Sequence, residues 1–123
     1  MLKAILIVGL GGGIGSILRY LASVVSEKYF HSTFPWATFA VNIVGCLLVG
    51  MLWGYFAKKQ FDDSAVQLLF ITGFCGGFTT FSAFALENVK MVQSGNTAGM
   101  LVYVLSSILI GLLAVWTGLA ITK

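Results

Sequence analysis

Charge is what this sequence lacks most. Only 9% of its 123 residues are charged and 59% are hydrophobic, whereas about a quarter of the residues in a soluble domain are charged. The mean hydropathy of +0.99 points the same way. A chain with so few polar side chains cannot cover an apolar core in water. We therefore exclude a soluble enzyme, a disordered chain and a fibrous protein, and predict an integral membrane protein with one transmembrane domain, 1–123.

The side chains of metal and redox sites are also scarce. Cys46 and Cys75 lie in separate apolar runs and form no CxxC pair, so neither a disulfide framework nor a zinc site is expected. The one histidine, His31, lies in a polar interval and is expected to be a solvated loop residue rather than a pH sensor. Seven basic residues are too few and too scattered to bind nucleic acid. The chain has no polar cluster outside its apolar stretches, so no enzyme activity is expected.

Four long stretches are nearly free of charge. About 20 apolar residues cross the hydrocarbon of a membrane as a helix, which predicts an all-α protein with transmembrane helices at about 4–25, 36–57, 66–92 and 97–121. The first stretch begins like a signal peptide, but Arg19 directly follows its apolar run and its removal would leave three spans, so we expect it to be retained. Four helices make a thin bundle that could hardly enclose a hydrated route, so an oligomer is expected.

The basic residues give almost no signal for orientation. With four spans, both termini and the middle connection share one side of the membrane. The two sides are nearly balanced, with Lys3, Lys58, Lys59 and Lys123 against Lys28, Lys90 and Arg19. Because positive charge orients membrane proteins, this balance predicts that the chain inserts both ways round and pairs as an antiparallel dimer. Chance in so small a count is the alternative.

Several polar side chains lie inside the predicted spans, where each needs a partner or a function. Arg19 either reaches the membrane interface or faces a water-filled vestibule, where it would favour an anion. Asn42, one turn after Thr38, either bonds another helix or faces a polar route, because an unpartnered amide in an apolar setting is costly. One face of the fourth helix carries three further polar residues, namely Tyr103, Ser106 and Ser107. Together with Asn42 they would form a ladder of neutral hydrogen-bond donors.

Glycine is abundant, at 15 residues, and many glycines lie four apart. Gly11 with Gly15 and Gly73 with Gly77 are examples of a spacing that lets helices approach closely in lipid. The run GLGGGIG does not fit the nucleotide-binding pattern GxGxxG, and no strand is predicted before it. We therefore expect these glycines to serve helix packing.

The third span contains the most informative segment, GFCGGFTTFSAF at 73–84. Three glycines followed by Thr79 and Thr80 make a weak helix, which predicts a break near the middle of the bilayer. Irregular backbone at that depth is tolerated only where it faces protein, lines a cavity or holds a cation. Phe81 and Phe84 share a face just after the break, with Ser82 beside them. Two such phenylalanines alone indicate core packing, but ring edges carry partial positive charge and can meet an anion.

Three segments together resemble the Fluc, or CrcB, family of fluoride channels. They are GGIGSILR ending at Arg19, the TxxxN of Thr38 and Asn42, and GFCGGFTTFSAF followed by Glu87. The resemblance covers all four spans and implies an antiparallel, dual-topology homodimer with two fluoride pores. It also implies the residues of each pore, which would be Thr38, Asn42, Phe81, Ser82, Phe84, Tyr103 and Ser107.

The resemblance implies further roles outside the pore lining. Arg19 would lie near the vestibule, and Glu87 would be the acid that follows the break in the third helix. The backbone carbonyls of Gly76 and Thr79, two from each subunit, would hold a structural sodium ion at the centre of the dimer.

The chain departs from the family pattern at Ala83, where members often carry a hydroxyl, and at Gly111, where some members do. The function expected is passive export of fluoride through the bacterial plasma membrane, since neutral donors can replace the water around a small, tightly hydrated anion. One alternative is a small multidrug-type exporter of dual topology, but such a protein needs an acid in its first helix and none precedes Glu27. The other is a non-transporting accessory subunit, which leaves the TTFS segment and Asn42 unexplained.

Overall fold

The computed structural model describes residues 1–59 and 64–122. Three spans are continuous helices, namely α1 (Leu2–Tyr29), α2 (Trp36–Lys59) and α6 (Thr97–Thr122). The other span is assembled from α3 (Ser64–Gln67), the π-helix η1 (Leu68–Cys75), α4 (Gly76–Phe78) and α5 (Phe81–Gln93). The described residues contain no strand, and four helical spans are long and apolar enough to cross a membrane. The predicted class, an all-helical membrane protein with four spans, is confirmed.

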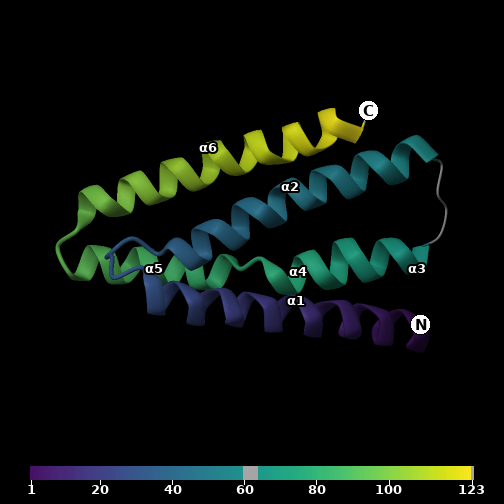
Figure 1. The fold of residues 1–123 in the computed structure, drawn as a ribbon, viewed down its shortest axis with the longest axis horizontal. Helices are drawn as coiled ribbons and strands as arrows, with labels where there is room; N and C mark the ends of the chain where they lie inside the picture. The colour runs from purple at the N-terminus through teal and green to yellow at the C-terminus, as the bar shows by residue number, and fades with distance from the viewer. Residues whose placement is uncertain (60–63, 123) are drawn as a thin grey trace.

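The helices pack as two pairs that lie side by side. α2 packs along α6, while α1 packs against η1 and α4 (Figure 1). Both described ends of the chain lie at one end of the bundle, and the connections at 30–35 and 94–96 lie at the other. Lys3 and Lys58 therefore belong to the first end, and Lys28 and Lys90 to the second. Of the other two lysines counted above, the Lys59 side chain and all of Lys123 lie outside the described part of the chain.

α1 continues well past the predicted end at 25. It runs to Tyr29, with Lys28 in its last turn, where a positive charge interacts favourably with the helix dipole. Arg19 is consequently ten residues from the end of the helix, which corresponds to about 15 Å at 1.5 Å per residue. Arg19 therefore lies well inside the length of α1 and not at the end of the bundle.

Glycine allows α1 to touch the third span. A Cβ atom on Gly11 or Gly15 would overlap main-chain atoms of η1, and a Cβ on Gly77 would overlap the main chain of Gly12. Gly13, by contrast, has no atom of another described segment within 4 Å of its Cβ position. The packing predicted from the glycine spacing is confirmed for the face of α1 that carries Gly11 and Gly15.

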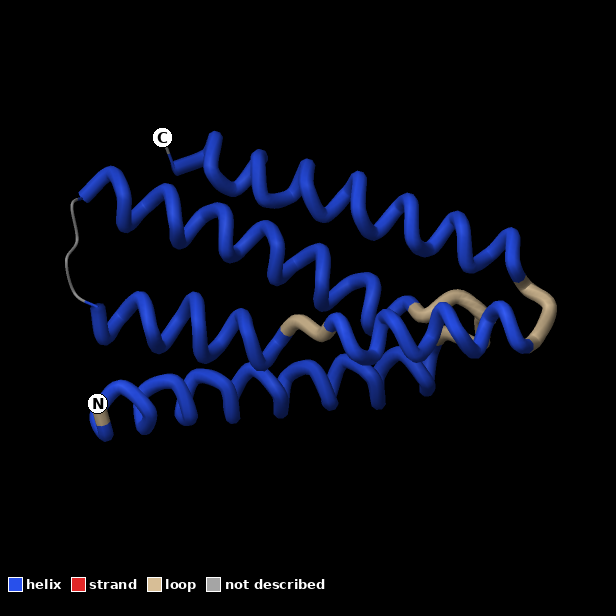
Figure 2. Tube along the Cα trace, turned by 180° about the vertical axis from the view of Figure 1, so that it is seen from behind, coloured by secondary structure: helices blue, strands red, loops and turns tan. Residues whose placement is uncertain are grey.

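Two extended residues interrupt the third span. Thr79 has φ −83° and ψ 157°, and Thr80 has φ −150° and ψ 119°; Figure 2 shows them as a short loop between helical segments. The Thr80 hydroxyl accepts the amide hydrogen of Ala83 at 3.2 Å and so caps the start of α5. The π-helix that precedes α4 had no counterpart in the sequence-based prediction.

Candidate functional site

A cavity of about 380 Å³ lies between α2, the interruption of the third span and α6. It brings together five of the residues predicted to form the pore or the cation site, namely Asn42, Thr79, Phe81, Phe84 and Ser107. The other lining residues are Gly45, Cys46, Val49, Thr80, Ile108 and Val115. The cavity therefore has a mostly apolar wall with a few polar groups, as expected of a site that binds a small solute.

Asn42 holds the interruption from the α2 side. Its Oδ1 accepts the Thr80 amide hydrogen at 2.8 Å, and its Nδ2 donates to the Thr80 carbonyl at 3.1 Å. Thr80 is only 9% exposed, so its main-chain groups need partners inside the protein. An amide nitrogen carries two hydrogens, and the bond to Thr80 uses one of those on Nδ2. Asn42 thus bonds a second helix and also borders the cavity.

Arg19 holds the interruption from the α1 side. Its Nε donates to the Gly77 carbonyl at 3.1 Å, and the Ser16 hydroxyl donates to the same oxygen at 3.4 Å. In an uninterrupted helix this carbonyl would accept the amide hydrogen of Phe81, which now begins a separate helix. Arg19 therefore satisfies a carbonyl that the interruption leaves without its helical partner. Arg19 thus bonds the third span, a role that neither of the two alternatives stated above included.

The two predicted aromatic rings lie on one edge of the cavity in different environments. Their centroids are 5.8 Å apart, and their planes make an angle of 41°. Phe84 is partly buried and meets the Tyr103 ring edge to face, at 5.0 Å and 62°. Phe81 is 79% exposed. Phe84 is therefore supported within the chain, whereas most of the Phe81 ring is left uncovered by it.

A carboxylate and two hydroxyls link three helices next to these rings. Thr38 of α2 donates to Glu87 Oε1 at 2.6 Å, and Tyr103 of α6 donates to Glu87 Oε2 at 2.8 Å. Thr38 is 7% exposed and Tyr103 is fully buried. Hydrogen bonds to a carboxylate are shorter and stronger than those between neutral groups, so this triad fixes the position of the tyrosine hydroxyl.

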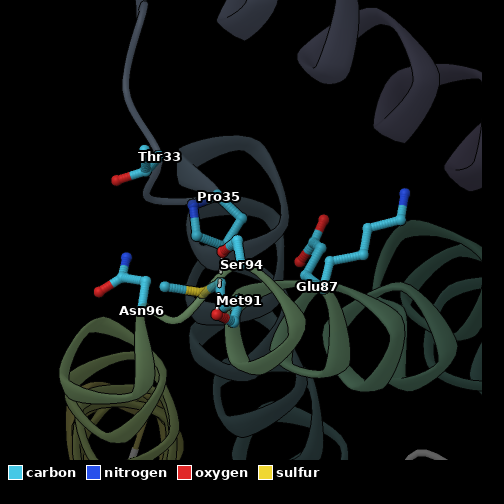
Figure 3. Close-up of a pocket in the computed structure, with 7 residues that line it drawn as sticks. Thr33, Pro35, Glu87, Met91, Ser94 and Asn96 are labelled. Atoms are coloured by element: carbon cyan, nitrogen blue, oxygen red, sulfur yellow. Dashed lines mark hydrogen bonds between the residues drawn. The ribbon is translucent and has the colours of Figure 1, made fainter.

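Glu87 also borders two pockets at the end of the bundle. One, of about 330 Å³, lies between α5 and the connections at 30–35 and 94–96, with Pro35, Lys90 and Asn96 among its lining residues (Figure 3). The other, of about 210 Å³, is lined by residues of the end of α1 and the start of α2. Glu87 thus borders both outer pockets and Thr38 borders the second, whereas no member of the triad lines the cavity at the interruption.

The two serines of α6 differ in their surroundings. The Ser106 hydroxyl donates to the Tyr103 carbonyl of its own helix at 3.3 Å. Ser107 lines the cavity, and its oxygen is buried without a hydrogen-bond partner among the described residues. Ser107, one turn from Tyr103, is therefore the serine that faces the cavity.

Comparison with known proteins gives a consistent result. Residues 6–119 match the family described as CrcB-like protein, Camphor Resistance (CrcB). The chain belongs to the CrcB family. Proteins named fluoride-specific ion channel FluC from Flavobacterium psychrophilum and Azobacteroides pseudotrichonymphae are each 48% identical, over 99% and 100% of this chain and 98% of each relative. Another so named, from Rhizobium johnstonii, is 44% identical over 100% of this chain and 98% of the relative. The resemblance inferred from the motifs is confirmed.

In this CrcB protein the remaining predicted site residues lie around the interruption. Ser82 is exposed, with its hydroxyl oxygen 3.3 Å from that of Thr80. Gly76 is exposed, with open space at its Cβ position. The Thr79 hydroxyl donates to the Cys75 carbonyl at 2.8 Å, so its side chain turns back toward η1. Arg19 bonds Gly77, two residues before Thr79, and Asn42 bonds Thr80, the residue after it.

Sequence reasoning missed the part played by Thr80. It treated this threonine only as a weak helix former, whereas in this CrcB protein Thr80 caps α5 and has both main-chain groups bonded to Asn42. A signal was available, because threonine directly before an apolar helical pattern is typical of a helix N-cap. No comparable signal identified Asn42 as its partner.

Proposed function

We propose that this CrcB protein is a fluoride channel of the bacterial plasma membrane, through which fluoride leaves the cytoplasm passively. One observation carries the proposal: the cavity at the interruption joins neutral donors, among them the unpartnered Ser107 hydroxyl, to the rings of Phe81 and Phe84. Relatives that match this chain over nearly its full length are named fluoride-specific ion channels. These names favour a channel over a multidrug-type exporter or an accessory subunit.

The contacts suggest a path for the ion. Fluoride enters from the pockets beside Glu87, passes the Tyr103 hydroxyl and the edge of Phe84, and reaches the cavity at Ser107. Tyr103 and Ser107 are one helical turn apart on α6. The one hydrogen of the Tyr103 hydroxyl is donated to Glu87, so this hydroxyl would turn from Glu87 to the ion as the ion passes. A pore of this kind replaces the hydration shell of the ion with hydrogen bonds that are too few to trap it. Thr38 borders the entrance at Glu87, and Ser82 lies beside the interruption.

A second copy of the chain completes the pore in our proposal. Phe81 borders the cavity but is 79% exposed, so an antiparallel partner would cover its ring. The near balance of basic residues between the two ends of the bundle supports insertion in both orientations. Thr79 is one of the two middle residues of the span Ser64–Gln93 and Thr80 directly follows it, which supports placing the interruption near the bilayer midplane, where two antiparallel copies cross.

The interruption also offers oxygen ligands for the structural sodium ion. The Thr80 amide, which would pair with the Gly76 carbonyl in an uninterrupted helix, is bonded to Asn42 instead. Gly76 lies on an exposed surface, where a second copy can approach. Main-chain carbonyls suit a hard monovalent cation. We propose that the carbonyls of Gly76 and Thr79, two from each subunit, hold sodium, whose positive charge joins the two chains.

The test is fluoride efflux from liposomes that contain only this protein, measured with a fluoride electrode beside a chloride control. We expect rapid release of fluoride with little release of chloride. Phe81→Ile should abolish most of the fluoride flux, because it removes a ring edge from the cavity. Phe70→Ile is the matched control, since Phe70 is 43% exposed on η1 and does not line the cavity. Absence of fluoride release from well-reconstituted protein would overturn the proposal.

A further inference from the structure

Cys46 lies on the same face of α2 as Asn42, one turn further along the helix. It lines the cavity together with Asn42 and Ser107, and it is partly exposed. The Ser107 oxygen is buried without a partner among the described residues, whereas a buried hydroxyl is ordinarily hydrogen-bonded, so this cavity has a hydroxyl available to a ligand. The thiol thus belongs to a cavity that already shows a polar group in need of a partner.

The thiol lies opposite a gap in the side chains of α6. A Cβ atom on Gly111, one turn past Ser107, would lie 3.6 Å from the Cys46 sulfur. Gly111 has no side chain and does not line the cavity, whereas Cys46 of α2, which lies against it, does. A thiol is a weak hydrogen-bond donor with a polarisable sulfur. The polar lining therefore passes from Ser107 on α6 to Cys46 on α2.

We propose that Cys46 forms the wall of the ion path one turn beyond Asn42, and that a small thiol reagent attached to it obstructs fluoride. This inference rests on the proposed function, since it concerns the same path. The reagent is methyl methanethiosulfonate. The Cys46 thiolate, having released its proton to the buffer, attacks the divalent sulfur of the reagent, which bears a methyl group and no oxygen. A new S–S bond forms, the S–S bond of the reagent breaks, and methanesulfinate leaves with the electron pair.

The chain contains its own control cysteine. Cys75, at the end of η1, is 2% exposed and does not line the cavity. The experiment compares full-length Cys75→Ala, which retains Cys46, with Cys46→Ala, which retains Cys75. Each variant is reconstituted, its fluoride flux is measured before and after treatment, and the modified cysteine is identified by mass spectrometry. The flux of each untreated variant serves as its own reference.

We expect treatment to attach one methylthio group to Cys46 of Cys75→Ala and to lower its fluoride flux by about tenfold or more, equivalent to about 1.4 kcal/mol on the barrier. Cys46→Ala should keep its own flux after treatment. Fluoride should also slow the modification of Cys46 relative to chloride at the same ionic strength, because fluoride occupies the path and chloride does not. A cysteine that faced only lipid would show no such protection.

The outcomes separate the two proposals. Complete modification of Cys46 with unchanged flux, or flux with a Cys46 that resists the reagent, would overturn this inference and leave the proposed function intact. Equal loss of flux in both variants would also overturn it, because the effect would not depend on Cys46. Absence of fluoride flux in the untreated wild-type protein would overturn the proposed function, and this inference with it.

Discussion

Replacing Asn42 with alanine tests whether one side chain holds the interruption of the third span. The change removes the acceptor of the Thr80 amide, at 2.8 Å, and the donor to the Thr80 carbonyl, at 3.1 Å. Thr80 is 9% exposed, so water cannot readily replace both partners. Each buried group left unpaired costs about 1–3 kcal/mol. We therefore expect Asn42→Ala to lower the free energy of unfolding by about 2–6 kcal/mol, out of the 5–15 kcal/mol that is typical of a protein.

The assay combines denaturation of the detergent-solubilised protein with fluoride efflux from liposomes. Asn42→Ala should lower the midpoint of denaturation. It should also reduce the fluoride flux, because the interruption positions Phe81 and Phe84, which line the cavity. Asn42→Asp should be intermediate in stability, since it keeps the acceptor for the Thr80 amide but turns a second oxygen toward the Thr80 carbonyl.

Asn88→Ala is the matched control. Its Nδ2 donates to the Phe84 carbonyl of the same helix at 2.8 Å, and its Oδ1 is buried without a partner among the described residues. Removing an unpaired buried oxygen offsets the loss of that bond, so we expect a change in stability within about 1 kcal/mol. Wild-type stability in Asn42→Ala, or an equal loss in Asn88→Ala, would refute the reasoning.

Three further substitutions test the contacts around the site. Arg19→Leu removes a charged donor from the end of α4 and should lower the free energy of unfolding by about 1.5–3 kcal/mol, with partial recovery in Arg19→Lys; equal denaturation midpoints for wild type and Arg19→Leu would contradict this. Gly15→Ala places a Cβ on the main chain of η1 and should prevent recovery of monodisperse protein in size-exclusion chromatography, whereas Gly13→Ala, which meets no atom of another described segment within 4 Å, should behave as wild type. Tyr103→Phe deletes the hydroxyl that donates to Glu87 and should lower the free energy of unfolding by about 1–3 kcal/mol. It should also reduce the fluoride flux, and a wild-type flux would show that this hydroxyl is not on the path.

Much of the architecture follows from local properties of the sequence. The scarcity of charge and the length of the apolar runs predicted four membrane-spanning helices, because the cost of burying a charge in lipid depends on each residue itself. The four-residue spacing of Gly11 and Gly15 predicted a close helix contact, since residues four apart lie on one helix face. The run of glycines and threonines at 73–80 singled out the segment where helical geometry is least favoured.

The partners of the polar residues were decided only by the tertiary structure. The bonds from Asn42 to Thr80, from Arg19 to Gly77 and from Thr38 to Glu87 join residues 38, 58 and 49 positions apart. A periodic pattern tells which face of a helix a residue occupies, but not which helix covers that face or at what height. The rotation and depth of each helix depend on the packing of all four, so the assembly of the cavity could not be read from any single segment.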